Sequence, residues 1–350
     1  MNKDILIIGA GISGLFLAYK LKKEGFSVKV LEANNRIGGR IFTKKVGNTN
    51  IELGATWLWE YNRELWALCN ELGVTFFEQN MNGDALFETN NSNLPQRLKI
   101  PENQQVSYRV VGGTIEILKR LANNLSIEEL ELNQKVIKIS ETDSRVKVLT
   151  ENATFVTDTV VSTLPPHLLV NTIKLPSNLD KELLSIANNT HTWMRNSIKF
   201  TVIYNIPFWR ETGLSGVGFS HIGPFTEIYD HSDNNDKTFA LMGFLNQELT
   251  YKTKHERELL VKNQLLKFFG SEANQYLSYE EKLWSKEPLT NFNSNYNLMP
   301  HANNGHSIYR HRFLNGKFIV AGSETSSSYG GYMEGAIIRS KEVISQLQLK

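Results

Sequence analysis

The sequence predicts an α/β protein of two domains, and three observations support this prediction. The chain has 350 residues, which is long for one hydrophobic core and natural for two. Residues 4–32 read as a strand, a glycine-rich turn, a helix and a second strand in immediate succession. Farther along, Arg195–Trp209 alternates like another strand, and His255–Gly270 reads as an amphipathic helix. We therefore expect a helix-covered parallel sheet and a second domain made of sheet and helix.

The composition is that of an ordinary globular protein and excludes several other classes. Hydrophobic residues make up 41% of the chain and charged residues 21%. The formal net charge of +2 provides no basic surface for nucleic acid. No apolar run exceeds the length of a strand, so we expect no membrane span, and the run Ile5–Ala10 lacks the cleavage site of a signal peptide. The single cysteine, Cys69, excludes an internal disulfide and fits a reducing compartment, so we expect a cytoplasmic protein.

The N-terminal turn has the spacing of a Rossmann-like dinucleotide site. Gly9 permits a tight turn after the strand, Gly11 allows the backbone to approach a pyrophosphate, and Gly14 allows the helix to pack against the strand. The start of the helix directs unpaired N–H groups toward the phosphates. Glu32, at the end of the second strand, is placed to accept hydrogen bonds from a ribose hydroxyl. Strand, turn, helix and acid occur together, so the pattern indicates nucleotide binding.

A second glycine loop favours the flavin dinucleotide FAD over NAD. Arg36–Arg40 reads Arg-Ile-Gly-Gly-Arg and follows directly after the expected ribose-binding acid. A dinucleotide that ends in a flavin needs further cationic and backbone donors along its diphosphate and ribityl chain. Next, Ile51–Trp59 combines a short strand with a turn of small residues, which allows a flat ring to lie against the backbone.

The C-terminal segment, Gly316–Leu347, also fits a flat ring. Four glycines between positions 322 and 335 leave little side-chain bulk there. A helix beginning near Tyr332 would direct its N-terminus at the pyrimidine end of a flavin and stabilise negative charge on it. A glycine-rich surface helix is the alternative, but it does not explain why the bulky Tyr332 and Met333 stand at the start of the helix.

Together these motifs resemble those of the flavin-containing amine oxidase superfamily, which includes monoamine and polyamine oxidases, L-amino-acid oxidases and related desaturases. The outer parts of the chain carry the resemblance in GAGISG, LEANNRIGGR, ELGATW, AGSET and GYMEGA. Between them, RVVGGTIEIL resembles the family's G-G helix start, ELNQKVIKI its strand with a valine against the adenine, and DTVVSTLPPHLL its crossover out of the nucleotide domain. The resemblance covers most of the chain and implies an FAD-dependent oxidoreductase.

The motifs imply an FAD-binding domain that is discontinuous in sequence. We assign residues 1–80, 107–168 and 293–350 to it, and residues 81–106 and 169–292 to the substrate domain. The first insertion, 81–106, is polar and rich in asparagine, so we expect it to be mostly loop. It is much shorter than the corresponding insertion in typical members of the superfamily, where that segment builds much of the substrate cavity.

One charged residue, Lys199, stands in the middle of the strand Arg195–Trp209. The apolar side chains alternate on one face, and Lys199 falls on the other between the polar Ser197 and Thr201. By itself this pattern allows a solvent-facing lysine on a half-buried sheet. In the superfamily the matching lysine precedes Pro-Phe-Trp at the same offset and holds a water against flavin N5. The resemblance therefore implies that Lys199 is catalytic.

The resemblance also implies an aromatic cage of two rings that flank the flavin and hold the amine. Tyr332 occupies one of the two positions, and we count it as catalytic. The other falls near Ser294, where no aromatic aligns, with Phe292 or Tyr296 as substitutes if the register shifts. Trp284 resembles the tryptophan that leads back to the flavin, and we include it among the catalytic residues.

The flavin is expected to be bound without a covalent link. In monoamine oxidases a cysteine beside the second cage position bonds the flavin, whereas this chain has Asn293 there and its cysteine elsewhere. We expect no metal, because the eight histidines show no paired ligand spacing. The residues expected to bind FAD are Gly9, Ala10, Gly11, Ile12, Ser13, Gly14, Glu32, Ala33, Arg36, Gly38, Gly39, Arg40, Gly54, Ala55, Thr56, Trp57, Val136, Gly322, Ser323, Glu324, Gly331, Tyr332, Met333 and Ala336.

We therefore expect an oxidoreductase that oxidises the C–N bond of a small-molecule amine by hydride transfer to flavin N5, with O2 as the acceptor and hydrogen peroxide as a product. Two alternatives stay open. One is a desaturase or dehydrogenase that acts on an apolar substrate and uses an acceptor other than O2. The other is a flavin-binding protein without activity of its own, against which the retention of Lys199 argues, since storage of FAD needs no charge at N5.

Overall fold

The computed structural model describes residues 4–90, 94–235, 237–292 and 298–348. Its first sheet has five parallel strands in the order β10-β2-β1-β14-β20. The strand order reverses between β1 and β14, and ligands of such sheets bind at the carboxyl ends beside this point. The predicted Rossmann-like α/β fold is thus confirmed. The strands are β1 (Asp4–Ile8), β2 (Ser27–Leu31), β10 (Leu130–Glu131), β14 (Thr159–Ser162) and β20 (Phe318–Val320).

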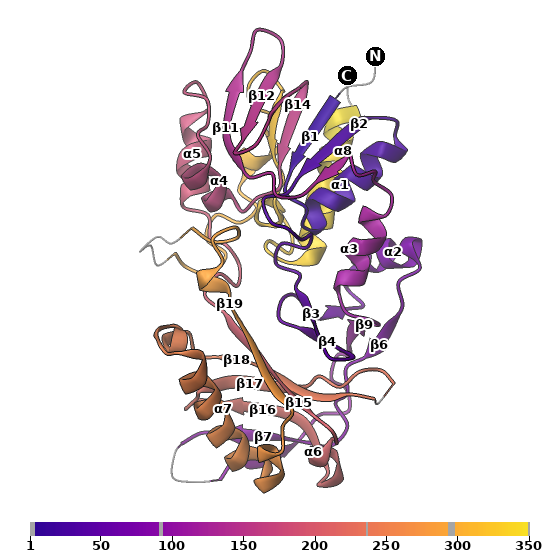
Figure 1. Cartoon of the computed structure of the whole chain (residues 1–350), viewed down its shortest axis with the longest axis vertical. Coiled ribbons are helices and arrows are strands. Elements are labelled where there is room, and N and C mark those ends of the chain that lie inside the picture. The colour runs from indigo at the N-terminus through magenta and orange to yellow at the C-terminus, as the bar shows by residue number, and fades with distance from the viewer. Residues whose placement is uncertain (1–3, 91–93, 236, 293–297, 349–350) are drawn as a thin grey trace.

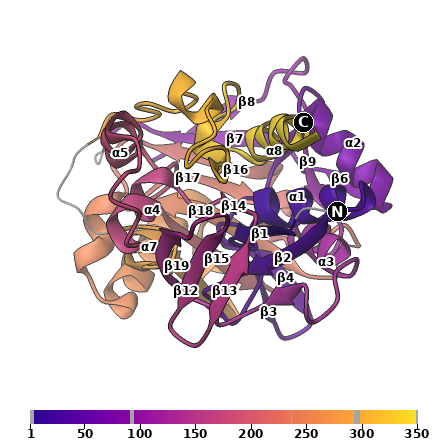
Figure 2. The same ribbon diagram turned by 90° about the horizontal axis from the view of Figure 1, so that it is seen from above.

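Both faces of this sheet are covered, as the uninterrupted apolar run of β1 predicts. Ile5 and Ile7 pack into one core with helices, and Leu6 and Ile8 pack into a second core beneath a small antiparallel sheet. Figure 2 shows α1 and α8 on one side of β1 and β14, and β12 and β13 on the other. The helices are α1 (Ile12–Lys23), α2 (Arg63–Leu72), α3 (Ile115–Ala122) and α8 (Met333–Gln348), and the small sheet is β11 (Val136–Glu141), β12 (Val146–Thr150) and β13 (Thr154–Thr157).

Two helices after the Pro-Pro crossover, α4 (Pro166–Thr172) and α5 (Lys181–Asn188), stay with the nucleotide-binding sheet. Their Leu169 and Leu183 belong to the same buried core as Phe318 of β20. The chain crosses to the second domain only after α5. We therefore propose the domain boundary between α5 and β15 rather than at residue 169.

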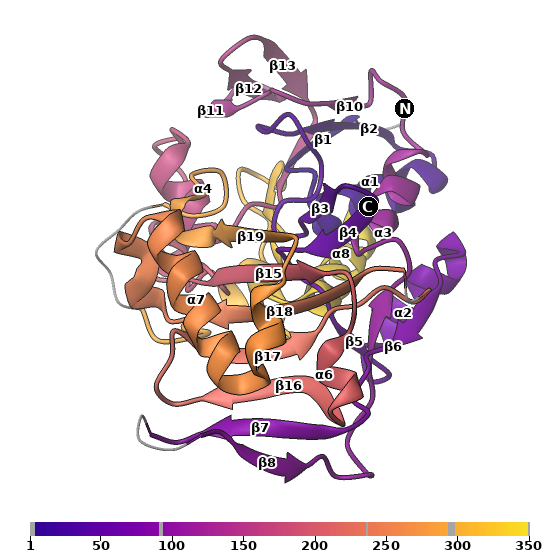
Figure 3. The same ribbon diagram turned by 60° about the horizontal axis from the view of Figure 1, so that its bottom comes forward.

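The second sheet has seven strands in the order β19-β15-β18-β17-β16-β7-β8 (Figure 3). Neighbours are antiparallel except β16 and β7. Helix α7 (Lys254–Phe269) covers one face and ends at Gly270, as its sequence predicts. A Thr253–Glu256 capping box begins it. The strands are β7 (Asp84–Glu88), β8 (Gln96–Lys99), β15 (Ile198–Tyr204), β16 (Leu214–Ser220), β17 (Phe225–Asp230), β18 (Phe239–Leu245) and β19 (Ser278–Leu283).

Most of the described residues of the insertion 81–106 lie outside strands, as predicted, but the insertion also supplies the two short strands β7 and β8. These strands form one end of the seven-stranded sheet. Leu86 of β7 is 4% exposed and belongs to the core beneath α7. Parallel pairing of β7 with β16 stabilises a strand that the surrounding asparagines obscure in the sequence.

A layer of short strands lies between the two sheets (Figure 1). The hairpin of β3 (Thr43–Val46) and β4 (Thr49–Glu52) contributes Ile51 to a small core shared with Ile203 of β15. Beside it, β5 (Leu58–Trp59), β9 (Ser107–Val110) and β6 (Phe76–Glu78) form a three-stranded sheet. The remaining elements are α6 (Phe208–Glu211), η1 (Gln247–Tyr251), η2 (Ser271–Asn274), η3 (Trp284–Lys286), η4 (Ser307–Arg310) and η5 (Ser323–Thr325). Within the described ranges, no helix has both the length and the apolar character to cross a bilayer.

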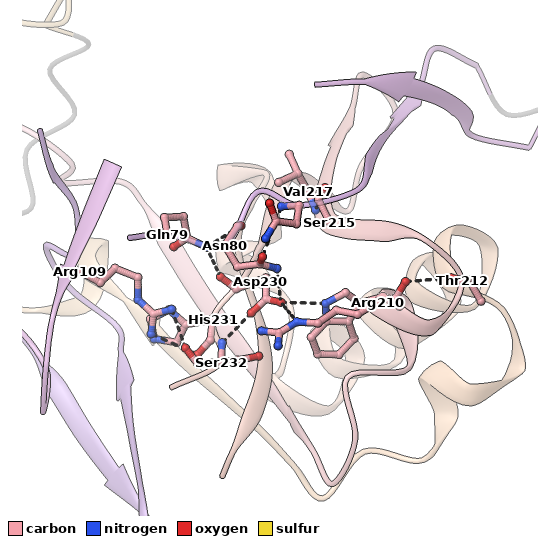
Figure 4. A network of polar contacts seen from close by, with 12 residues as sticks. Gln79, Asn80, Arg109, Arg210, Thr212, Ser215, Val217, Asp230, His231 and Ser232 are labelled. Carbon is pink, nitrogen blue, oxygen red and sulfur yellow. Dashed lines mark hydrogen bonds and ion pairs between the residues drawn. The ribbon is translucent and has the colours of Figure 1, made fainter. Parts of the chain in front are cut away.

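A buried polar network joins this middle layer to the seven-stranded sheet (Figure 4). The Asp230 carboxylate accepts hydrogen bonds from Trp209 Nε1 at 2.9 Å and Arg210 Nε at 2.8 Å. Arg109 of β9 donates to the backbone oxygens of Ser232 at 2.8 Å and His231 at 3.2 Å. Arg109, Asp230, His231 and Ser232 are buried, so the network fixes β9 against the β17–β18 connection.

Candidate functional site

A cavity of about 650 Å³ runs from the carboxyl ends of β1 and β2 to strands β15 and β18 of the second sheet. Its volume lies within the range of about 300–1,000 Å³ that is usual for small-molecule and cofactor sites. Ile8 and Leu31 close one end, and Lys199 and Phe244 line the other. The cavity therefore spans the junction of the two domains.

The glycine-rich turn forms one end of the cavity. Gly9 has φ +105°, a conformation that favours glycine, and a side chain at Gly14 would place its Cβ 1.9 Å from the Gly9 carbonyl oxygen. At Gly11 a Cβ would meet only the Gly38 carbonyl oxygen, at 3.8 Å, and would otherwise project into the cavity. Gly9 and Gly14 are thus required by the protein, whereas the space at Gly11 is available to a ligand.

Glu32 lies at the cavity wall where β2 ends. Its carboxylate accepts hydrogen bonds from the backbone N–H groups of Ala10 and Asn34, each at 2.8 Å. Burial raises the pKa of this carboxyl above its ordinary value, although the two hydrogen bonds oppose the change. The residue stands at the position that the ribose of a dinucleotide would reach.

The two arginines of the second glycine loop have different partners. Arg36 donates to the backbone oxygens of Gly39 at 3.1 Å and Ile37 at 3.2 Å, so it holds the loop in shape. Arg40 forms a bidentate ion pair with Glu324, in which Nη1 lies 2.6 Å from Oε1 and Nη2 lies 2.9 Å from Oε2. Burial alone would raise the pKa of the Glu324 carboxyl, but Arg40 lowers it below its ordinary value. Both guanidinium groups also line the cavity.

Four residues that the sequence places at the cofactor do not line the cavity. Ala10 and Gly14 lie behind the first turn, where Ala10 binds Glu32 and Gly14 contacts Gly9. Gly322 packs on the Leu164 backbone, and Glu324 is fully buried beneath Arg40. These four residues contact residues of the cavity wall and not the cavity itself. A binding motif contains residues that stabilise the turn as well as residues that contact the ligand. The other predicted cofactor residues all line the cavity.

Lys199 is buried, so the solvent-facing alternative is wrong. Its side chain is 2% exposed and lines the cavity from β15. The ammonium group donates to the Gly54 carbonyl oxygen at 2.7 Å and to Thr56 Oγ1, and it lies 5.0 Å from the centre of the Trp57 ring. Burial lowers the pKa of Lys199 to about 7, helped by Arg109 and opposed by Glu52 and Glu227. A lysine that changes charge near neutrality is typical of a functional site.

Aromatic side chains from several segments line the same cavity. Tyr332 lies beside Trp193, with ring centres 5.3 Å apart, and Tyr61 stacks on Tyr329 at 6.0 Å. Trp284 also lines the cavity, and its Nε1 donates to the Leu53 carbonyl oxygen at 2.9 Å. Lys199, Tyr332 and Trp284, the three predicted catalytic residues, therefore meet in one cavity.

The second cage position falls partly outside the residues that the structure describes. Asn293, Ser294 and Tyr296 lie outside them. Phe292 is described, but its ring lies 6.0 Å from that of His167 and does not line the cavity, so this substitute for the cage ring is wrong. Trp193, which sequence reasoning missed, is the aromatic residue that lies beside Tyr332.

Several other lining residues were not predicted from the sequence. Trp59 and Tyr61 directly follow the ELGATW motif, so the run of aromatics there was an available signal. Glu227 carries no such signal, because its role depends on the pairing of β17 with β18. Among the described residues, no three His, Cys, Asp or Glu side chains gather as a metal site would require.

Comparison with known proteins agrees with this geometry. The family model described as "Flavin containing amine oxidoreductase" matches residues 74–343, and that of an NAD(P)-binding Rossmann-like domain matches residues 7–72. The first match covers well over half of the chain. The chain belongs to the flavin-containing amine oxidoreductase family. It is therefore an oxidoreductase that carries a flavin.

Two curated relatives illustrate the breadth of the family. The chain is 24% identical to a probable flavin-containing monoamine oxidase A of Dictyostelium discoideum, over 95% of each protein. It is also 24% identical to a putrescine oxidase of Kocuria rosea, over 83% of this chain and 84% of the relative. A solved putrescine oxidase bound to putrescine has the same fold, with a TM-score of 0.87, 20% identity and full coverage of both chains.

The cavity residues fit a flavin dinucleotide. No side chain caps α1 in the described structure, and Gly11, Ile12 and Ser13 at its start line the cavity. This end suits a pyrophosphate, with Glu32 beside it for a ribose. At the other end, the loop from Gly54 to Trp57 and the start of α8 at Met333 line the space that would hold a flat ring.

Proposed function

We propose that the protein is an FAD-dependent amine oxidase that converts an amine to an imine and passes the electrons to O2, which gives hydrogen peroxide. The observation that carries this proposal is the position of Lys199, buried at the opposite end of the cavity from the dinucleotide turn. The names of the relatives, a monoamine oxidase and a putrescine oxidase, support an amine as the substrate.

FAD, when bound, would supply the acceptor for a hydride from the carbon next to the amine nitrogen. The chain's own residues have to bind and orient the amine and exclude water. The aromatic wall that includes Trp193, Tyr332 and Trp57 attracts an ammonium ion through its ring faces. Lys199 carries less charge near neutral pH than an exposed lysine, so it repels a cationic substrate less.

We propose that FAD is bound without a covalent link. Cys69, the single cysteine of the sequence, is 0% exposed in α2 and does not line the cavity. Burial raises the pKa of its thiol to about 12, which removes the reactive thiolate. The cysteine content also supports the cytoplasm as the proposed location.

The test is an anaerobic titration of the FAD-loaded protein with a panel of primary, secondary and di-amines, followed by admission of air. We expect one class of amine to bleach the flavin absorbance, and air to restore it with formation of peroxide. The same panel should be repeated with a quinone in place of O2, because a dehydrogenase would recover its colour only with the quinone. Absence of bleaching by every amine, together with bleaching by an apolar C–C substrate, would overturn the proposal in favour of a desaturase.

A further inference from the structure

Residues of the ELGATW segment also line a second cavity, of about 240 Å³. Polar side chains line it, among them Glu52, Thr56 and Arg109, and its outer part is formed by exposed asparagines such as Asn50. Since a water molecule occupies about 30 Å³ in the liquid, a polar cavity of this size holds several. The cavity therefore offers a water-filled route into the middle layer.

Thr56 is the residue that lines both cavities. Its side chain is 3% exposed, and its hydroxyl accepts a hydrogen bond from Lys199 while it donates to the Gly54 carbonyl oxygen at 3.0 Å. A hydroxyl has two acceptor sites and one rotatable proton, so it can exchange partners on either side. Thr56 thus separates Lys199 from the second cavity by one side chain.

Glu52 is a carboxyl group built into the wall of the second cavity. It is 3% exposed and accepts hydrogen bonds from the Thr114 backbone N–H at 2.6 Å and from Thr43 Oγ1 at 3.0 Å. A Cβ at Gly113 would lie 2.9 Å from the Glu52 carboxylate and 2.5 Å from Thr43. Gly113 of RVVGGT therefore makes room for the buried Glu52 carboxylate.

Three further charged or titratable groups, Glu227, Arg109 and His231, lie around Lys199 and Glu52. Glu52 on β4 and Glu227 on β17 raise the pKa of Lys199, Arg109 on β9 lowers it, and the charge of Lys199 in turn lowers the pKa of His231. Burial raises the pKa of the Glu52 carboxyl, opposed by Thr114 and by the charges of Lys199 and Arg109. Burial therefore shifts the pKa values of Glu52 and Lys199 toward each other, and Glu52 lines the second cavity.

We propose that Glu52 sets the charge of Lys199, and that Lys199 exchanges its proton with solvent through the second cavity by way of Thr56. One N–H bond of the ammonium breaks and one O–H bond forms, on a cavity water and then on the Glu52 carboxylate or in solvent. The transfer needs no oxidant and no further reactant. This inference rests on the proposed role of Lys199 for its significance, but its test requires no amine and no turnover.

The probe is cyanate, which carbamoylates only neutral amines, applied to the FAD-loaded protein over a range of pH. Peptide mass spectrometry reports the rate of labelling at Lys199, and its pH midpoint gives the pKa of that amine. We expect Glu52→Gln to move the midpoint to lower pH, because a carboxylate that favours the ammonium is gone. At any pH below both midpoints, the labelling rate should rise on the order of tenfold for each pH unit by which the midpoint falls.

Two matched variants separate the charge of Glu52 from its packing. Glu52→Asp should restore the midpoint toward that of the parent, since it keeps the charge. Asp233→Asn removes a carboxylate from the outer part of the same cavity and should leave the midpoint unchanged. A parental midpoint in Glu52→Gln, or an equally lowered midpoint in Asp233→Asn, would overturn the role of Glu52.

The water route is tested independently at Asn50, which is exposed at the outer part of the second cavity. Asn50→Phe should slow the exchange of the Lys199 ammonium protons with water, measured by NMR on protein that contains 15N-labelled lysine, whereas Asn50→Ala should exchange at the parental rate. Equal exchange rates in the two variants would overturn the route. This pair decides the question even if Glu52→Gln does not fold.

Discussion

Lys199 has an ionisable side chain, which is usual at the surface, but it is buried among the residues of β15 and the ELGATW segment. Its strand has buried side chains on both faces, and the ammonium is held by one carbonyl and one hydroxyl oxygen rather than by an adjacent carboxylate. Alternation along β15 predicted which face Lys199 occupies, but not that this face is covered. The covering residues, Gly54 and Thr56, are about 145 positions away in the sequence and reach Lys199 only through the fold.

Lys199→Met should slow the reoxidation of photoreduced protein by air. The change keeps the length of the side chain and removes its charge, and one preorganised charge is typically worth about 2.7–4 kcal/mol in the step that it serves, or roughly 10²–10³ in rate. Stopped-flow absorbance measures the rate, and bound FAD should remain at the parental level. An unchanged rate would favour the dehydrogenase alternative.

The same substitution should change how stability depends on pH. Burial lowers the pKa of Lys199 to about 7 in the folded protein, below its ordinary value of 10.5, so the unfolded chain binds more protons between these two values. The stability of the parent therefore rises with pH across this window, and Lys199→Met lacks this contribution. Denaturant unfolding at pH 7, 8.5 and 10 should show the advantage of the variant shrinking as pH rises. The exposed Lys254, changed to Met, is the control, and parallel curves for Lys199→Met and the parent would contradict the prediction.

At the scale of elements, the sequence predicted those turns and helices whose conformation depends on neighbouring residues. The turn from β1 to α1 follows from its glycine spacing, and α7 follows from its amphipathic pattern and terminal glycine. Strand β7 was missed because its neighbours are asparagines and its partner β16 is distant in sequence. Elements that are stabilised by pairing with a remote strand leave only a weak signal in a single sequence.

Substitutions of two glycines in the β1–α1 turn should have different effects, one on stability and one on FAD binding. Gly14→Ala should lower the stability of the protein even without FAD, because its Cβ would lie 1.9 Å from the Gly9 oxygen. Gly11→Ala should fold as the parent does and bind FAD more weakly, because its Cβ occupies ligand space. Thermal unfolding of the flavin-free proteins and FAD titration separate the two effects. Parental FAD affinity in Gly11→Ala would show that no phosphate approaches this turn.

Acid precipitation should release all of the FAD into the supernatant. The only thiol of the sequence is buried within α2, away from the cavity, so no cysteine can form the link. Absorbance of the pellet and supernatant measures the partition, and a denatured sample digested with protease controls for trapping. Yellow pellet that survives digestion would indicate a histidyl or tyrosyl link instead.

The whole molecule brings together a site that no single domain contains. The cavity runs between the two sheets, and its aromatic wall includes Trp193, which lies in the connection from α5 to β15. The sequence predicted both ends of the site, because the glycine-rich turn at one end and the segments with Lys199 and Tyr332 at the other are motifs of fixed spacing. Trp193 and Glu227 act through their place in the assembled molecule, which spacing along the chain does not encode.

Asp230→Ala should loosen the junction between the middle layer and the seven-stranded sheet. It removes the acceptor that Asn80, which follows β6, shares with Trp209 and Arg210, and breaking such a buried network costs on the order of 3 kcal/mol. Denaturant unfolding measures the loss. The exposed Asp143, changed to Ala, should alter stability by less than about 0.5 kcal/mol. Equal stability of the two variants would show that the network does not hold the layers together.

The position of β20 and α8 also has a consequence for biosynthesis. The parallel sheet that begins with β1 is completed by residues 318–320, and the cavity by Met333 and Ala336. While the ribosome is still translating, the nascent chain exposes the glycine-rich turn without the far wall of its cavity. The cavity that would hold the flavin is therefore complete only after β20 and the first turn of α8 have been translated.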